Sequence, residues 1–188
     1  MADDAELAAR IRDPMVAIED VRLHAAQRST SGLFVAAGVE ATAGVVVGLT
    51  ADDDTTRGAG ALLLGAGVVH ATQSWLQLSF ADRRHAAFMA DLSESEGHPE
   101  AWPAMARDLR LDVERDARGH AFASGVYASV LGAAAIAIAA GADPEPAAAV
   151  VGVGATGLFH HVVRWRTATR LSVDLDTVPL AVPGPVSQ

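Results

Sequence analysis

Four ionisable side chains lie inside long apolar stretches of the sequence, where a charge needs a partner. Glu40 is central in the first stretch, His70 lies in the second, and His160 and His161 lie in the fourth. A lone carboxylate in an apolar helix is either protonated or paired with another group. These side chains could therefore relay protons, hold an ion or ligate a cofactor. The alternative is that each one only hydrogen-bonds a neighbouring helix.

A polar face accompanies His70. Gln73, Ser74 and Gln77 follow it by three, four and seven residues, which places all four side chains on one side of a helix. A polar face within a membrane span points into the helix bundle. The sequence therefore predicts that His70 and Gln73 face the interior.

A proton or cation pathway is one function that these residues could serve. Glu40, His70 and His160 would carry the ion through a small channel or transporter. Tyr127, in the third apolar stretch, would extend the path toward His120 at the inner end of that stretch.

A second chemical alternative is a bis-histidine redox subunit. If His70 and His160 lie at one depth on facing helices, they could hold the iron of haem b from both sides. Gly67 and Gly157 precede these histidines by three residues each and would leave room for the macrocycle. The histidines could instead share a metal ion or a proton with Glu40, and the sequence leaves the identity of any metal or other cofactor open.

The composition excludes several other kinds of chemistry. The chain has no cysteine and no lysine, so thiolate metal sites, a P-loop lysine and a Schiff-base lysine are absent. No zinc-protease, hydrolase, kinase or dinucleotide-binding motif is present. The net charge of −9 argues against nucleic acid as a partner. A non-enzymatic role is therefore favoured.

Four apolar stretches are each close to the ~20 residues that cross a bilayer as a helix. The sequence therefore predicts an all-α, integral membrane four-helix bundle whose main partner is the lipid bilayer. A soluble bundle with a buried apolar core is the alternative. The expected spans are residues 32–49, 58–80, 121–140 and 146–165.

The arginines predict the orientation of these spans. Four precede the first span, six lie between the second and third, and three follow the fourth, whereas only Arg57 lies in a loop on the other side. Cytoplasmic loops carry the excess of basic residues. We therefore expect a multi-pass protein of the cell membrane with both termini in the cytoplasm.

The chain reads as two hairpins of one design, which predicts a tandem repeat. Each hairpin has a short acidic outer turn and arginines at its inner end. Two spans per repeat preserve the orientation of the second copy. Three residues of the second stretch recur 90 residues later in the fourth, as the pairs Gly67/Gly157, His70/His160 and Trp75/Trp165.

The remaining segments are expected to be cytoplasmic. A helix should begin at Asp13 and Pro14 and lie either on the membrane surface or on the bundle. Residues 93–99 should separate two helices of the long connection, and Trp102, Leu109 and Val113 should pack on the N-terminal helix. The expected parts are N-terminal helices (1–30), a first hairpin (31–80), a helical connection (81–119), a second hairpin (120–166) and an extended tail (167–188).

Small residues predict where the helices approach most closely. Gly44 and Gly48 form a GxxxG match on the same helix face as Glu40, and Gly67 and Gly157 are further candidates for close packing. Such faces also let chains associate in lipid. The first functional interpretation is therefore a non-enzymatic membrane subunit that forms a homo-oligomer or joins a larger membrane complex.

Overall fold

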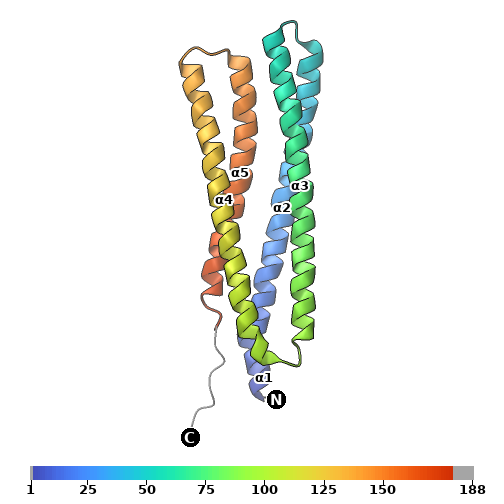
Figure 1. Cartoon of the computed structure of the whole chain (residues 1–188), viewed down its shortest axis with the longest axis vertical. Helices are drawn as coiled ribbons and strands as arrows, with labels where there is room; N and C mark the ends of the chain where they lie inside the picture. Colours follow the sequence, from blue (N-terminus) through green and yellow to red (C-terminus); the bar gives the residue numbers. More distant parts are fainter. Residues whose placement is uncertain (1, 180–188) are drawn as a thin grey trace.

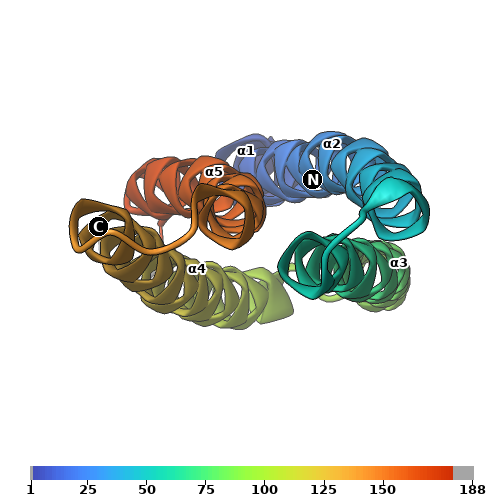
Figure 2. The same cartoon turned by 90° about the horizontal axis from the view of Figure 1, so that it is seen from above.

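The structure, a computed structural model, describes residues 2–179, which form helices and contain no strand (Figure 1). The four long helices make two antiparallel hairpins that lie side by side (Figures 1 and 2). We call the end with the two hairpin turns the turn side, and the opposite end the terminus side. The elements are α1 (Ala2–Leu7), the π-helical η1 (Ala8–Arg12), α2 (Asp13–Thr50), α3 (Asp54–Glu94), the 3-10 turn η2 (Pro99–Ala101), α4 (Trp102–Ala139) and α5 (Pro144–Leu175).

Local chemistry sets the two hairpin turns. Asp53 caps α3, because its carboxylate accepts hydrogen bonds from the Thr56 amide at 2.8 Å and the Thr56 hydroxyl at 2.7 Å. The turn between α4 and α5 contains Gly141 with φ of 89°, a left-handed conformation that favours glycine. Both turns are short, so each pair of helices packs side by side.

Glycines bring the helices of the first hairpin into backbone contact. A Cβ on Gly60 would lie 2.6 Å from the Gly48 nitrogen and 2.9 Å from the Gly44 oxygen. A Cβ on Gly67 would lie 2.7 Å from the Ala37 oxygen. The hairpins therefore pack more closely within themselves than on each other.

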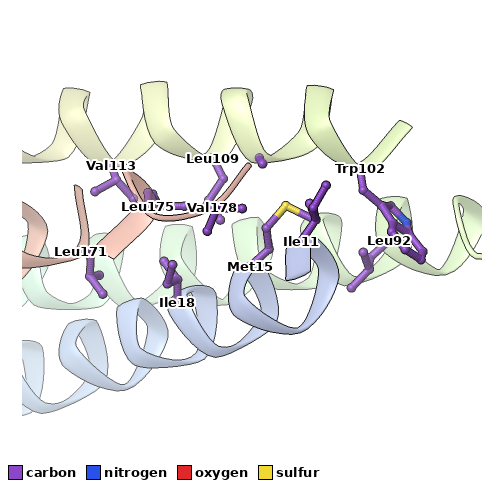
Figure 3. Packing of buried hydrophobic residues seen from close by; sticks show 11 residues of the cluster. Ile11, Met15, Ile18, Leu92, Trp102, Leu109, Val113, Leu171, Leu175 and Val178 are labelled. Carbon is purple, nitrogen blue, oxygen red and sulfur yellow. The ribbon is translucent and has the colours of Figure 1, made fainter. Parts of the chain in front are cut away.

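The terminus side has a conventional apolar core (Figure 3). Met15 and Ile18 of α2 pack with Trp102, Leu109 and Val113 of α4, as the sequence predicts, and also with Ile11, Leu92, Ala106, Leu171, Leu175 and Val178. This core fixes the four helices relative to one another outside the glycine-rich half.

This packing decides two expectations, one about the N-terminal helix and one about the tail. The helix that begins near Asp13 lies on the bundle and runs without a break to Thr50. The expectation of an extended tail from residue 167 is wrong up to Leu175, because Leu171 and Leu175 enter the core one turn apart and continue α5. Residues 180–188 of that tail lie outside the described residues.

Three of the four long helices are long and apolar enough to cross a membrane: the segments Ala5–Thr50, Pro99–Ala139 and Pro144–Leu175. Four such helices were expected, but α3 does not reach this apolarity. The reason is its own polar face, since His70, Gln73 and Gln77 interrupt its apolar run. Their inward side chains lower the mean hydropathy of α3, while Val68 and Val69 keep its outer face apolar.

The close contact between α2 and α3 predicts opposite effects for two glycine-to-alanine changes. Gly60→Ala should destabilise the protein by about 1–3 kcal/mol, because the methyl group meets backbone atoms that cannot move aside. Gly65→Ala should be neutral or slightly stabilising, because its Cβ meets nothing within 4 Å. Thermal unfolding in detergent compares the two variants, and equal melting temperatures would contradict the contact.

Candidate functional site

A buried carboxylate–imidazole pair joins the two helices of the first hairpin. The Oε2 atom of Glu40 lies 2.7 Å from Nδ1 of His70, and the side chains are 9% and 2% exposed. Oε1 of Glu40 is buried without a hydrogen-bond partner among the described residues. A short bond between two titratable groups can hold one proton that moves between them.

Tyr127 of α4 lies against this pair and links it to the second hairpin. Its ring centroid is 6.4 Å from that of His70 and 5.5 Å from that of His161, on which it stacks. Gly157 makes room for it, because any Cβ at that position would collide with the tyrosine ring. The ring therefore occupies the space between the Glu40–His70 pair and the histidines of α5.

An arginine fixes the direction of the hydrogen bonds between the next two histidines. Nε of Arg164 lies 3.4 Å from Nε2 of His120, and because arginine only donates, this nitrogen accepts. His120 then donates from Nδ1 to Nδ1 of His161, 3.0 Å away. His161 then carries its hydrogen on Nε2, which lies 3.3 Å from Nε2 of Gln73. A half-turn of the Gln73 amide places its oxygen at this position, where it can accept that hydrogen.

His160 ties the second hairpin to both helices of the first. Its Nδ1 lies 3.2 Å from the carbonyl oxygen of Ser29, which can only accept, so His160 donates there. Its Nε2 lies 2.9 Å from Oε1 of the Gln77 side chain. The ring is 4% exposed and packs edge-on against His161 at a centroid distance of 5.0 Å.

A cluster of four charges follows on the terminus side. Arg22 donates from Nε and Nη2 to Oδ2 of Asp116 at 3.2 and 2.8 Å, and Arg84 donates to the same oxygen at 3.3 Å. Glu19, 1% exposed, accepts from Nη1 of Arg22 at 3.3 Å. The charges alternate, which offsets part of the cost of their burial.

Burial and neighbouring charge shift the pKa values in this cluster. Burial alone would raise the pKa of Asp116, but the charge and hydrogen bonds of Arg22 and the charge of Arg84 outweigh it and lower the pKa below 3.8. Burial, and then the neighbouring Arg22, lower the pKa of Arg84. Asp116 is therefore held as an anion that pairs with both arginines.

A small cavity connects this cluster with the histidines. It is lined by Arg22 and Asp116 on one side and by His120 and Arg164 on the other. Its volume is about 10 Å³, close to the minimum for one water molecule. Polar groups thus follow one another from the surface near Asp116 to the Glu40–His70 pair.

The polar network ends at Glu40. Ten residues separate Glu40 from the end of α2 on the turn side, a distance of roughly 15 Å along the helix. On that side every buried described residue is glycine or alanine: Gly44, Ala59, Gly60, Ala134, Ala147, Ala149 and Gly154. The network is therefore connected to one end of the bundle and closed toward the other.

The structure brings together most of the residues that the sequence singles out. Glu40, His70, Gln73, Tyr127, His160 and His161 lie around one interface between the hairpins. Among the glycines, Gly44 and Gly67 meet backbone of the facing helix and Gly157 meets Tyr127, whereas a Cβ on Gly48 would meet nothing within 4 Å.

The hydrogen bonds of His70 and His160 disfavour a haem bound between these two residues. His70 is engaged by Glu40, and both nitrogens of His160 are engaged by Ser29 and Gln77. Among the described residues, no group of three His, Cys, Asp or Glu side chains is placed to hold a metal ion.

Sequence reasoning missed the charge cluster and Arg164. Asp116 precedes His120 by four residues, and Tyr127 follows seven later, so the three lie on one face of α4. This polar face of α4 is the sequence signal from which Asp116 could have been predicted as a site residue. Nothing in the sequence pairs it with Arg22 and Arg84, which come from two other helices.

No protein-family model, curated protein or solved structure matches this chain.

Asp116 should be more important for stability than its neighbour Asp112. Asp116→Asn removes one of the two carboxylates that pair with Arg22 and Arg84, and should destabilise by roughly 1–3 kcal/mol, because the cluster is partly buried and Glu19 remains. Asp112→Asn is the control, because its pair with Arg115 is exposed and contributes at most ~1 kcal/mol. Chemical unfolding in detergent measures both.

The same residue sets a pH dependence. Because folding lowers the pKa of Asp116, its contribution to stability is complete above pH 3.8 and is lost as the pH falls through the lowered pKa. Wild type should lose more stability than Asp116→Asn below pH 3.8. If stability measured against pH falls in parallel for the two proteins, Asp116 is not the group that causes this loss.

Proposed function

We propose that this chain is a multi-pass membrane protein with four spans that binds protons at Glu40 and His70 and passes them along the interface between its hairpins. The observation that carries the proposal is the buried Glu40–His70 pair and its polar connection to one end of the bundle only. The first interpretation, a membrane subunit that self-associates, is kept as a second candidate.

The distribution of side chains supports insertion in lipid. His70 and Ser74 of α3 are 2% and 1% exposed, whereas Val68 and Val69 of the same helix are 58% and 61% exposed. This helix therefore buries polar groups and exposes apolar ones, the reverse of a soluble bundle. The outward apolar face supports α3 as the fourth span.

The positions of the arginines and tryptophans support an orientation with the terminus side in the cytoplasm. All arginines except Arg57 lie toward that side. Trp75 and Trp165 are 65% and 42% exposed and would lie at the inner interface, where aromatic residues gather. The cell membrane is kept as the proposed location.

The tandem repeat stays a prediction. His70 and His160 are both buried on the last helix of their hairpins, but they have different partners. If the hairpins arose from one unit, their histidines have since taken separate roles.

Protons fit the network better than larger ions. Successive groups lie within hydrogen-bond distance or in ring contact, and the cavity near Asp116 holds at most about one water molecule. A hydrated metal ion would need a wider path. Protons can move by exchange along hydrogen bonds without such a path. Between His161 and His70 the Tyr127 ring makes contact without a hydrogen bond, so this step requires a bridging water molecule or a rotation of the tyrosine side chain.

The closed turn side supports a transporter or proton-driven switch over an open channel. Protons from the cytoplasm would reach Glu40 and His70, but release to the other side requires the glycine- and alanine-lined region to open. The hairpins are the natural moving parts, because each is tight within itself and looser against the other.

Proton uptake into liposomes tests the proposal. Wild-type protein should dissipate an imposed pH gradient, and Glu40→Gln should reduce the rate to that of protein-free vesicles, because the amide cannot exchange a proton. Glu94→Gln is the matched control, since Glu94 is exposed at the end of α3. Equal rates for wild type and Glu40→Gln would remove the proton site.

A second candidate, self-association, is favoured by glycines that no intrachain contact requires. Gly125 and Gly132 are seven residues apart on α4, and a Cβ on either would meet nothing within 4 Å. The apolar stretch of α4 is also the least buried of the three. Small residues on a lipid-facing helix allow a second helix to approach closely.

Native mass spectrometry in mild detergent tests this candidate. Gly132→Leu should convert an oligomer to monomers, because the larger side chain separates the two α4 helices. Gly38→Leu, also at an open position but on α2, should leave the oligomer intact. A wild type that is strictly monomeric would exclude the candidate.

A further inference from the structure

A groove runs between the hairpins on the side where α2 faces α5. Its volume is about 490 Å³, and Leu33, Ala36, Phe159 and Val163 supply apolar walls. Gly32 also lines it, at an open position where a Cβ would meet nothing within 4 Å. The groove is thus largely apolar and accessible from outside the bundle.

Positive charge gathers at the terminus-side end of this groove. Arg28 lines it directly and is exposed. Arg166 and Arg170 follow Val163 by three and seven residues, so they extend the same side of α5, and both are exposed. Within residues 5–179, no carboxylate lies within ion-pair distance of these three arginines.

We propose that this groove binds one anionic phospholipid of the cytoplasmic leaflet, with its phosphate at Arg28 and Arg166 and an acyl chain along Leu33 and Phe159. The proposal rests on the membrane insertion put forward above, but not on proton transfer. Arg28 lies four residues before the expected start of the first span, which places it at the level of lipid headgroups.

The charges favour a lipid over a second copy of the chain. Guanidinium groups bind phosphate oxygens in a bidentate manner, and arginines next to a span attract anionic lipids. A second copy related by an axis along the membrane normal would bring its own three arginines to the same depth. Repulsion between like charges would then oppose its docking at this end.

The groove also reaches the polar network. His160 lies in its wall, and that residue binds the Ser29 carbonyl and Gln77. A bound lipid would therefore cover the histidine that connects the two hairpins. Its headgroup and chain would bridge α2 and α5, the helices between which the groove opens.

Native mass spectrometry of the full chain in mild detergent tests the site. The protein is titrated with phosphatidylglycerol or with phosphatidylcholine of the same acyl composition. Wild type should retain one phosphatidylglycerol in preference to phosphatidylcholine. Arg28→Gln should weaken that binding about fivefold, the ratio expected for one arginine, and Arg28→Gln with Arg166→Gln should weaken it further. Arg83→Gln is the control, because Arg83 lies over the Phe80 ring of α3, away from the groove.

Filling the groove gives an independent readout. Ala36→Trp leaves the charges intact but occupies the space for the chain, so it should abolish retention of the lipid. Equal binding of the two lipids, or wild-type binding by both arginine variants, would overturn the proposal. Loss of a dimer instead of a lipid in Ala36→Trp would also overturn it and would identify a second copy as the occupant.

The outcomes separate this site from the proposed proton path. A lipid site that fails while Glu40→Gln still abolishes proton uptake leaves the proton path in place. Lipid retention without any proton uptake leaves the groove in place and removes the proton path. A protein that stays monodisperse without detergent would refute membrane insertion and both proposals.

Discussion

The cost of burying charge among small side chains governs this structure. Glu40 lies in a half of the bundle where glycine and alanine provide no donor, so its carboxylate depends on His70 from the facing helix. Gly44, Gly60 and Gly67 let α2 and α3 approach closely. The glycines and the polar pair therefore hold the same two helices together.

The two kinds of contact are divided between two kinds of interface. Within each hairpin, small residues place backbone or a ring against a glycine, as at Gly60 and Gly157. Between the hairpins, hydrogen bonds of Gln73, Gln77 and His160 form much of the contact. Tight apolar packing resists displacement, whereas hydrogen bonds can exchange partners. This difference between the two interfaces supports the proposal that each hairpin is rigid and that the hairpins move against each other when the protons of the network rearrange.

Helix periodicity and turn chemistry predict most of the fold. The four helices, their antiparallel order, the separation near residues 93–99 and the inward face of α3 all follow from the spacing of residue types. The pairing of Glu40 with His70, rather than of His70 with His160, could not be predicted. It depends on the register and rotation of the facing helices, which the spacing of residues within one helix does not set. The uninterrupted length of α2 and α5 was missed because their polar ends resemble separate segments.

Those uninterrupted helices connect the apolar core of the terminus side to the polar network. Asp116 lies at the junction: one turn before it Val113 enters the core, and one turn after it His120 joins the histidines. Arg22 and Arg84 bind it from α2 and α3, so this one carboxylate joins both helices of the first hairpin to α4 of the second. A change of charge at His120, across the one-water cavity, would alter the field at that carboxylate. If the proposed function holds, protonation of the histidines would therefore act on one of the contacts that join the two hairpins.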